Sequence, residues 1–291
     1  MGAQDTAMIR WKAPFTERNG KFSPLKSATF IALTLPALWL AYQYVDGDLA
    51  PKPITELIHG FGDWGLRILV LSLLISPVRQ AGQWGKLLSV RRMIGVAAFA
   101  YLFGHFCLYV VDQHFELGHV ASEIALRFYL TIGFIALVGL GALAATSTDA
   151  MIKRLGGKAW NRLHSLIYVI SLLGLWHYFI QSKLDISKPV FLGGLLAALL
   201  LYRLARKFSW SVEASVYSSL IAAPILAALA EASWYHFLRH IDFWMVLSGN
   251  WDLTDNLHSA VLAGCVAAGV AALYILRNAP GSRVPVLRAA E

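Results

Sequence analysis

The chain is poor in charge and in cysteine. Only 14% of its 291 residues are charged, 57% are hydrophobic, and the mean hydropathy is +0.57. This composition excludes an ordinary soluble domain. The two cysteines, Cys107 and Cys265, lie in apolar runs and form no CxxC or CxxCH pattern. Neither a disulfide framework nor covalent c-type haem attachment is therefore predicted.

Nucleotide-binding signatures are also missing. The sequence contains no GxGxxG or Walker A pattern, and no stretch outside the apolar runs is long enough for a folded flavin or nicotinamide domain. The net charge is +8, but the basic residues are divided among the connections between apolar runs. We therefore predict no nucleic-acid binding, and we interpret these charges as flanks of membrane spans.

Eight apolar runs are long enough to cross a membrane, which takes about 17–25 residues. They predict an all-α fold, a polytopic transmembrane helical bundle. The predicted spans are 27–45, 61–78, 92–111, 124–146, 160–181, 189–206, 212–234 and 256–277. Gly-rich segments such as 193–198 are expected at close helix contacts.

The basic residues also predict an orientation. Alternating the connections between two sides puts 19 of the 25 lysines and arginines on the side of the termini. Both termini are therefore predicted to be cytoplasmic. Residues 1–26 are basic but are followed by no small-residue cleavage site, so we expect a cytoplasmic tail instead of a signal peptide.

Three of the nine histidines, His105, His164 and His177, lie inside predicted spans and are not grouped with the span ends and loops; ionisable groups inside spans are costly and often functional. His105 and His177 are both close to the outer ends of spans, so they share a depth. Two neutral imidazoles at one depth suit the iron of a b-type haem. His164 lies 13 residues before His177, roughly 20 Å nearer the cytoplasm. The third span offers Arg92 at that inner level, which cannot bind iron.

Each of these residues has a second interpretation. The three histidines could instead form hydrogen bonds within the bundle. Arg67 is close in depth to His105 and His177 and is a candidate contact for a haem propionate, while snorkelling to the outer headgroups is an equal alternative. The other histidines are predicted at span ends or in loops; His59 is the best candidate among them because it opens the second span.

Three segments resemble a known family. They are ELIHGFGDWGLRILVLSLLISPVR (56–79), SVRRMIGVAAFAYLFGHFCLYVVD (89–112) and GGKAWNRLHSLIYVISLLGLWHYF (156–179). They are similar to the haem-binding membrane subunit of the bacterial periplasmic methionine-sulfoxide reductase system, within the ferric-reductase-like transmembrane superfamily. The resemblance implies that His105, His164 and His177 are haem ligands, with one b haem or two.

The resemblance also implies partners and a location. The protein would sit in the bacterial inner membrane and take electrons from the quinol pool or a cytoplasmic flavin reductase. It would pass them to a periplasmic molybdenum-cofactor subunit that reduces methionine sulfoxide in proteins. Flavin mononucleotide (FMN) or a quinone is a further candidate cofactor. A basic cluster at the inner loops could attract a flavin phosphate, although topology alone also explains it.

The expected domains are a tail (1–26), a ferric-reductase-like haem-binding region (27–211) and an extension with two further spans (212–291). The loop 235–255 in this extension could dock the partner or cap the membrane surface. Two other functions are open: direct reduction of ferric chelate or dioxygen at an outer haem, and a non-redox assembly or transport protein. The last predicts no stoichiometric haem.

Overall fold

The described residues fold entirely as helices with short connections. The computed structural model describes residues 15–16, 21–183, 185–252 and 257–279, where the only strand-like pairing is an isolated bridge between Thr16 and Phe22. Eight helical segments in these ranges are long and apolar enough to cross a membrane. The predicted all-α bundle with eight spans is thus confirmed, and the chain is a multi-pass membrane protein. Most of the predicted N-terminal tail and residues 280–291 lie outside the described residues.

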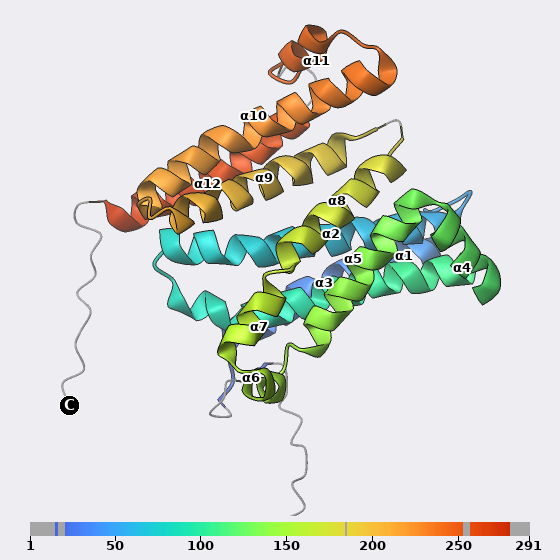
Figure 1. Ribbon diagram of the computed structural model, residues 1–291, viewed down its shortest axis with the longest axis horizontal. Coiled ribbons are helices and arrows are strands. Elements are labelled where there is room, and N and C mark those ends of the chain that lie inside the picture. The colour runs from blue at the N-terminus through green and yellow to red at the C-terminus, as the bar shows by residue number, and fades with distance from the viewer. Residues whose placement is uncertain (1–14, 17–20, 184, 253–256, 280–291) are drawn as a thin grey trace, which may run out of the picture.

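Figure 1 shows the helices coloured in chain order. Their bounds are α1 (Pro24–Asp46), α2 (Pro53–Ala81), the 3-10 helix η1 (Gly85–Leu87), α3 (Leu88–Asp112), α4 (Leu117–Leu126), α5 (Phe128–Ala145), α6 (Asp149–Leu155), α7 (Gly157–His164), α8 (Ile167–Gln181), α9 (Ser187–Lys207), α10 (Val212–Arg239), α11 (Phe243–Gly249) and α12 (Ser259–Asn278). The short helices α4 and α11 lie at one end of the bundle and α6 at the other (Figure 1). We call these the α4 end and the α6 end.

Helices α2 and α9 form the centre of the bundle. Half of the apolar window of each is buried, against at most 28% for the other spans. One apolar core surrounds α2 and joins α3, α5, α8 and α9, and a second joins α9 to α10 and α12. The remaining spans expose many large apolar side chains, as lipid-facing helices do.

Small residues let the C-terminal helices pack closely on α9. Ala223, Ala227, Ala260 and Ala263 are completely buried between these helices. A Cβ on Gly194 of α9 would lie 2.7 Å from the Cβ of Ala227, closer than real Cβ atoms approach. The predicted packing role of segment 193–198 is therefore confirmed.

A tyrosine closes a gap in α1 at a proline. Pro36 lies inside α1, and a proline interrupts the helical hydrogen-bond ladder. The Tyr101 hydroxyl of α3 donates to the Leu33 carbonyl at 2.7 Å and accepts from the Ala37 amide at 2.9 Å. A neighbouring helix thus supplies the partners that lipid cannot.

Two predicted spans differ from the structure. Residues 124–126 do not begin the fourth span, because they end the separate helix α4, and α5 begins only after Arg127. The fifth span is not one continuous helix, because α7 ends at His164 and α8 begins at Ile167. The 13 residues from His164 to His177 therefore do not lie on one continuous helix.

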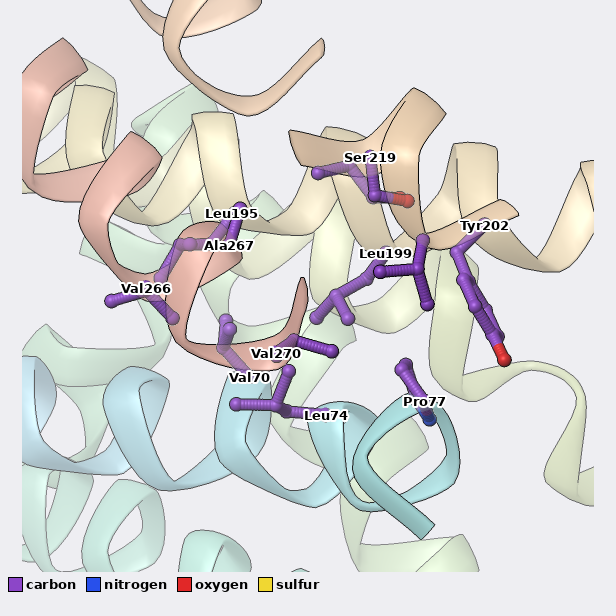
Figure 2. Close-up of a pocket in the computed structure, with 12 residues that line it drawn as sticks. Val70, Leu74, Pro77, Leu195, Leu199, Tyr202, Ser219, Val266, Ala267 and Val270 are labelled. Carbon is purple, nitrogen blue, oxygen red and sulfur yellow. The ribbon is translucent and has the colours of Figure 1, made fainter. Parts of the chain in front are cut away.

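A small apolar cavity of about 40 Å³ lies between α2, α9, α10 and α12 (Figure 2). Val70, Leu74, Leu199 and Val270 are among the residues that line it. Tyr202 also lines the cavity, but its hydroxyl donates a hydrogen bond to the side chain of Gln80. A cavity without polar partners stays dry, so we interpret it as a packing gap.

Candidate functional site

A large cavity occupies the half of the bundle nearest the α4 end. Its volume is about 870 Å³, within the range of roughly 300–1,000 Å³ that is usual for small-molecule sites. Helices α2, α3, α5 and α8 form its walls, and α4 and the start of α9 contribute residues to its α4 end. Its deeper part is apolar and its α4 end is polar, so it suits a flat, mostly apolar group with charged substituents at one edge.

His105 and His177 lie opposite each other in this cavity. Their ring centroids are 6.4 Å apart, and the ring planes are inclined by 80°. His105 comes from α3 and His177 from α8, so the structure brings together the two histidines that the sequence placed at one depth. Both rings line the cavity.

The two rings are held by equivalent hydrogen bonds. Nδ1 of His105 is 2.7 Å from the carbonyl oxygen of Ile58, and Nδ1 of His177 is 2.8 Å from that of Tyr129. A carbonyl only accepts, so each Nδ1 carries the hydrogen and donates it. The lone pair of each neutral ring is therefore on Nε2. Metal-binding histidines in proteins are oriented in this way.

A glycine gives each imidazole access to its carbonyl. Gly62 and Gly133 each follow the accepting residue by four positions, where a side chain would lean over that carbonyl. A Cβ on Gly62 would be 3.0 Å from Nδ1 of His105, and a Cβ on Gly133 would be 2.8 Å from Nδ1 of His177. The sequence analysis did not identify these two glycines, because a sequence does not show how close a residue lies to a neighbouring helix.

The geometry fits two ligands on one iron. Metal–imidazole bonds of about 2.0–2.1 Å, the length known from zinc sites, would allow two imidazole nitrogens held by one metal ion to be roughly 4 Å apart. The observed centroid distance of 6.4 Å then leaves about 1.2 Å per ring, which is close to the radius of an imidazole. The two side chains, their fixed tautomers and the apolar cavity around them fit a haem group.

Arg67 forms an ion pair with Asp63, an acidic residue at the cavity. Its Nη2 is 2.8 Å from Oδ2 of Asp63, and its guanidinium lies over the Trp64 ring at 5.1 Å. Asp63 lines the cavity and also accepts a hydrogen bond from the Tyr178 hydroxyl at 3.1 Å. Nζ of Lys188 is 3.9 Å from the same carboxylate. The suggested propionate contact of Arg67 stays a prediction.

Sequence reasoning missed the other cations at the cavity. Arg127 and Lys188 both line it. Nε of Arg127 is 2.5 Å from the Glu123 carboxylate. A hydrogen bond with Tyr129, followed by the charge of Glu123, raises the pKa of Arg127 above its ordinary value. Arg127 therefore keeps its positive charge at this end.

His164 lies elsewhere and does not line this cavity. It stacks on Trp160 with ring centroids 3.8 Å apart, and its Nε2 is 3.2 Å from the Thr146 hydroxyl. Arg91 and Arg92 are its charged neighbours. No ring contact joins His164 to another histidine in the described ranges. Its role as an inner haem ligand stays a prediction.

The remaining histidines divide by position. His59 and His119 line the polar end of the cavity, although sequence reasoning placed His119 in a solvated loop. His236 and His240 are at the end of α10, where His240 is the helix C-cap with a φ of 56°. The described residues contain no group of three or more potential metal-binding side chains.

The fold and the paired histidines place the chain among membrane proteins related to ferric reductases. Residues 61–175 match the family described as "Ferric reductase like transmembrane component". The matched region includes all of α3 with His105. It ends inside α8, two residues before His177. No solved structure matches the chain.

Curated relatives narrow this class to one family. The chain is 42% identical to the protein-methionine-sulfoxide reductase heme-binding subunit MsrQ of Rhodospirillum rubrum, over 61% of this chain and 86% of the relative. The corresponding values are 41%, 62% and 84% for MsrQ of Herminiimonas arsenicoxydans, and 37%, 60% and 83% for MsrQ of Caulobacter vibrioides. The chain belongs to the MsrQ family.

Proposed function

We propose that this protein is a b-type haem electron-transfer subunit of a methionine-sulfoxide reductase system. The observation that carries the proposal is the His105–His177 pair, in which both Nδ1 atoms donate to backbone carbonyls and both lone pairs are left on Nε2. Bound haem would supply one-electron redox chemistry. The names of the relatives, which are heme-binding subunits, support the same cofactor.

The chain's own residues set the position and surroundings of this group. His105 and His177 would hold the iron, and apolar side chains such as Leu66, Leu102 and Ile170 would exclude water from the ring. Arg127 and Lys188, with Arg67 behind Asp63, would offer positive charge to the propionates at the α4 end. No residue needs to act as a nucleophile, acid or base in this function.

The proposed topology follows from the same arrangement. The protein would lie in the bacterial inner membrane with its α6 end toward the cytoplasm, and its donor would be the quinol pool or a cytoplasmic flavin reductase. The α4 end would face the periplasm, where the molybdenum-cofactor partner would be. The positive-inside bias and the cavity at the α4 end support this direction. His164 is the candidate ligand of a second, inner haem. FMN or a quinone as a further cofactor stays a prediction.

Visible spectroscopy tests the proposal. We would purify the wild type, His105→Ala, His177→Ala and His164→Ala after expression with adequate haem, and record reduced-minus-oxidised spectra with haem quantified per chain. His236→Ala, at the exposed end of α10, is the matched control. We expect His105→Ala and His177→Ala to lose the same b-type component and the control to keep it. A wild type without haem would exclude this function and favour the assembly or transport protein.

A second comparison separates an electron carrier from a direct reductase. The chemically reduced protein would be mixed with its periplasmic partner, with ferric citrate or with dioxygen, and haem reoxidation would be followed by stopped flow. The proposal expects the partner to reoxidise the haem faster than either small acceptor. The reverse order would show that the protein itself reduces a small outer substrate.

A further inference from the structure

Asp63 of α2 is an acid held in the wall of the large cavity. Its side chain lines the cavity and is 12% exposed. The hydroxyl of Tyr178 on α8 donates to its Oδ1 at 3.1 Å. Arg67, one turn further along α2, pairs with Oδ2 at 2.8 Å, and Nζ of Lys188 at the start of α9 is 3.9 Å from the same oxygen. Side chains from α2, α8 and α9 therefore fix this carboxylate in place.

The carboxylate lies beside both candidate iron ligands. Asp63 directly follows Gly62, where a Cβ would be 3.0 Å from Nδ1 of His105. Tyr178, which donates to Asp63, directly follows His177. This hydrogen bond thus joins the chain neighbour of a residue packed on one ring to the chain neighbour of the other ring. A charge at Asp63 is therefore near any group that the two imidazoles hold.

The negative charge of Asp63 faces the cavity more directly than the charges of its partners. Arg67 does not line the cavity, so the carboxylate stands between this cation and the cavity. The side chains of Arg67 and Lys188 are 37% and 62% exposed, against 12% for Asp63. Solvent screens exposed charges much more than buried ones. The acid therefore acts on the cavity more strongly than the cations that pair with it.

We propose that Asp63 is a positioning residue that lowers the reduction potential of the haem held by His105 and His177. The inference rests on the proposed function. When the iron accepts one electron from the donor, the site loses one unit of positive charge, so a fixed negative charge nearby favours the oxidised state. Charges and hydrogen bonds around a haem are known means of setting its potential. A lower potential makes the reduced group a stronger electron donor to the next partner.

Potentiometric titration of the purified holoprotein tests this role. Visible spectra at a series of applied potentials give the midpoint potential of the component that His105→Ala and His177→Ala lose. The test variants are Asp63→Asn, which keeps the shape of the side chain, and Arg67→Gln. Glu116→Gln is the matched control, because Glu116 is an exposed acid at the start of α4 that does not line the cavity.

Asp63→Asn should raise the midpoint potential. At the wild-type midpoint, its ratio of reduced to oxidised haem should be at least about threefold higher, where a tenfold change corresponds to about 59 mV for one electron. Arg67→Gln should shift the potential in the opposite direction, because it removes a positive charge. The double variant should return close to the wild type. A general disturbance of packing would instead move both single variants in the same direction.

The outcomes separate this inference from the proposed function. A wild type without haem would overturn both. With haem present, an Asp63→Asn potential equal to that of Glu116→Gln, or a higher potential in Arg67→Gln, would overturn the role of Asp63 alone. Where Asp63→Asn retains no haem, Arg67→Gln and Lys188→Gln decide: a lower potential in both supports the role, and an unchanged potential in both overturns it.

Discussion

Gly133 provides the space that the ring of His177 occupies, because a Cβ at Gly133 would stand 2.8 Å from its Nδ1. The His177 ring donates to the carbonyl oxygen of Tyr129, which lies four residues before Gly133 on α5. Gly62 stands in the same relation to His105 and Ile58. The chain thus uses one local device twice, a glycine one helical turn after the carbonyl that orients each histidine.

Gly133→Ala should therefore weaken haem binding without removing a ligand. The added methyl group would push His177 from the Tyr129 carbonyl, and loss of such an orienting contact costs about 10-fold or more in metal affinity. Haem per chain and the reduced-minus-oxidised spectrum would measure this. Gly95→Ala on α3 is the control, since a Cβ there meets nothing within 4 Å. Equal haem content in the two variants would contradict the role of Gly133.

Tyr101→Phe should destabilise the bundle by about 1–3 kcal/mol, because it leaves the Leu33 carbonyl and the Ala37 amide without their partner. Pro36→Ala should reduce this cost, since a regular helix would pair these groups within α1. A double-mutant cycle on the free energy of unfolding in mixed micelles measures the coupling. Additive effects of the two substitutions would show that Tyr101 does not serve the proline site.

Glu231→Gln should raise the thermal stability of the C-terminal helices. Glu231 and Asn250 are 8% and 2% exposed, and Oε2 of Glu231 and Oδ1 of Asn250 are buried acceptors without partners in the described ranges. An amide would bring a donor to this pair of acceptors, and an unsatisfied buried group costs about 1–3 kcal/mol. Calorimetry of the purified protein would detect the gain, with Glu231→Ala as the comparison. A lower Tm for the glutamine variant would mean that the carboxylate has a compensating partner.

Asp185 gives a prediction for pH. Its carboxylate accepts from the Ser187 amide at 2.9 Å at the start of α9, and the hydrogen bonds with Ser187 lower the pKa of Asp185 below its ordinary value of 3.8. The stabilisation is therefore complete above about pH 3.8 and disappears as the pH falls through the lowered pKa.

Asp185→Ala should thus cost less than about 1 kcal/mol at neutral pH, because the group is largely exposed and solvent screens it. Its Tm difference from the wild type should shrink below pH 3.8. Asp185→Asn, which keeps a capping acceptor, serves as the control and should show a smaller difference throughout. A wild-type advantage over Asp185→Ala that grows in acid would contradict this account.

The sequence by itself determined the membrane class, the eight spans and the common depth of His105 and His177. These properties follow from the chain's own pattern: apolar length decides which segments can cross a bilayer, and a fixed rise per residue decides how deep each side chain lies. The motifs around both histidines also carried the family resemblance, which the relatives confirmed.

Only the tertiary structure decided what the histidines contact. The groups around the histidines come from other parts of the chain: the carbonyls of Ile58 and Tyr129, the two glycines and the charges of Arg127 and Lys188. Their positions depend on the rotation and packing angle of the helices, which periodicity does not specify. The break between α7 and α8 likewise separates His164 from the geometry of His177. Depth is a property of one helix, whereas a binding site requires several helices to face one another.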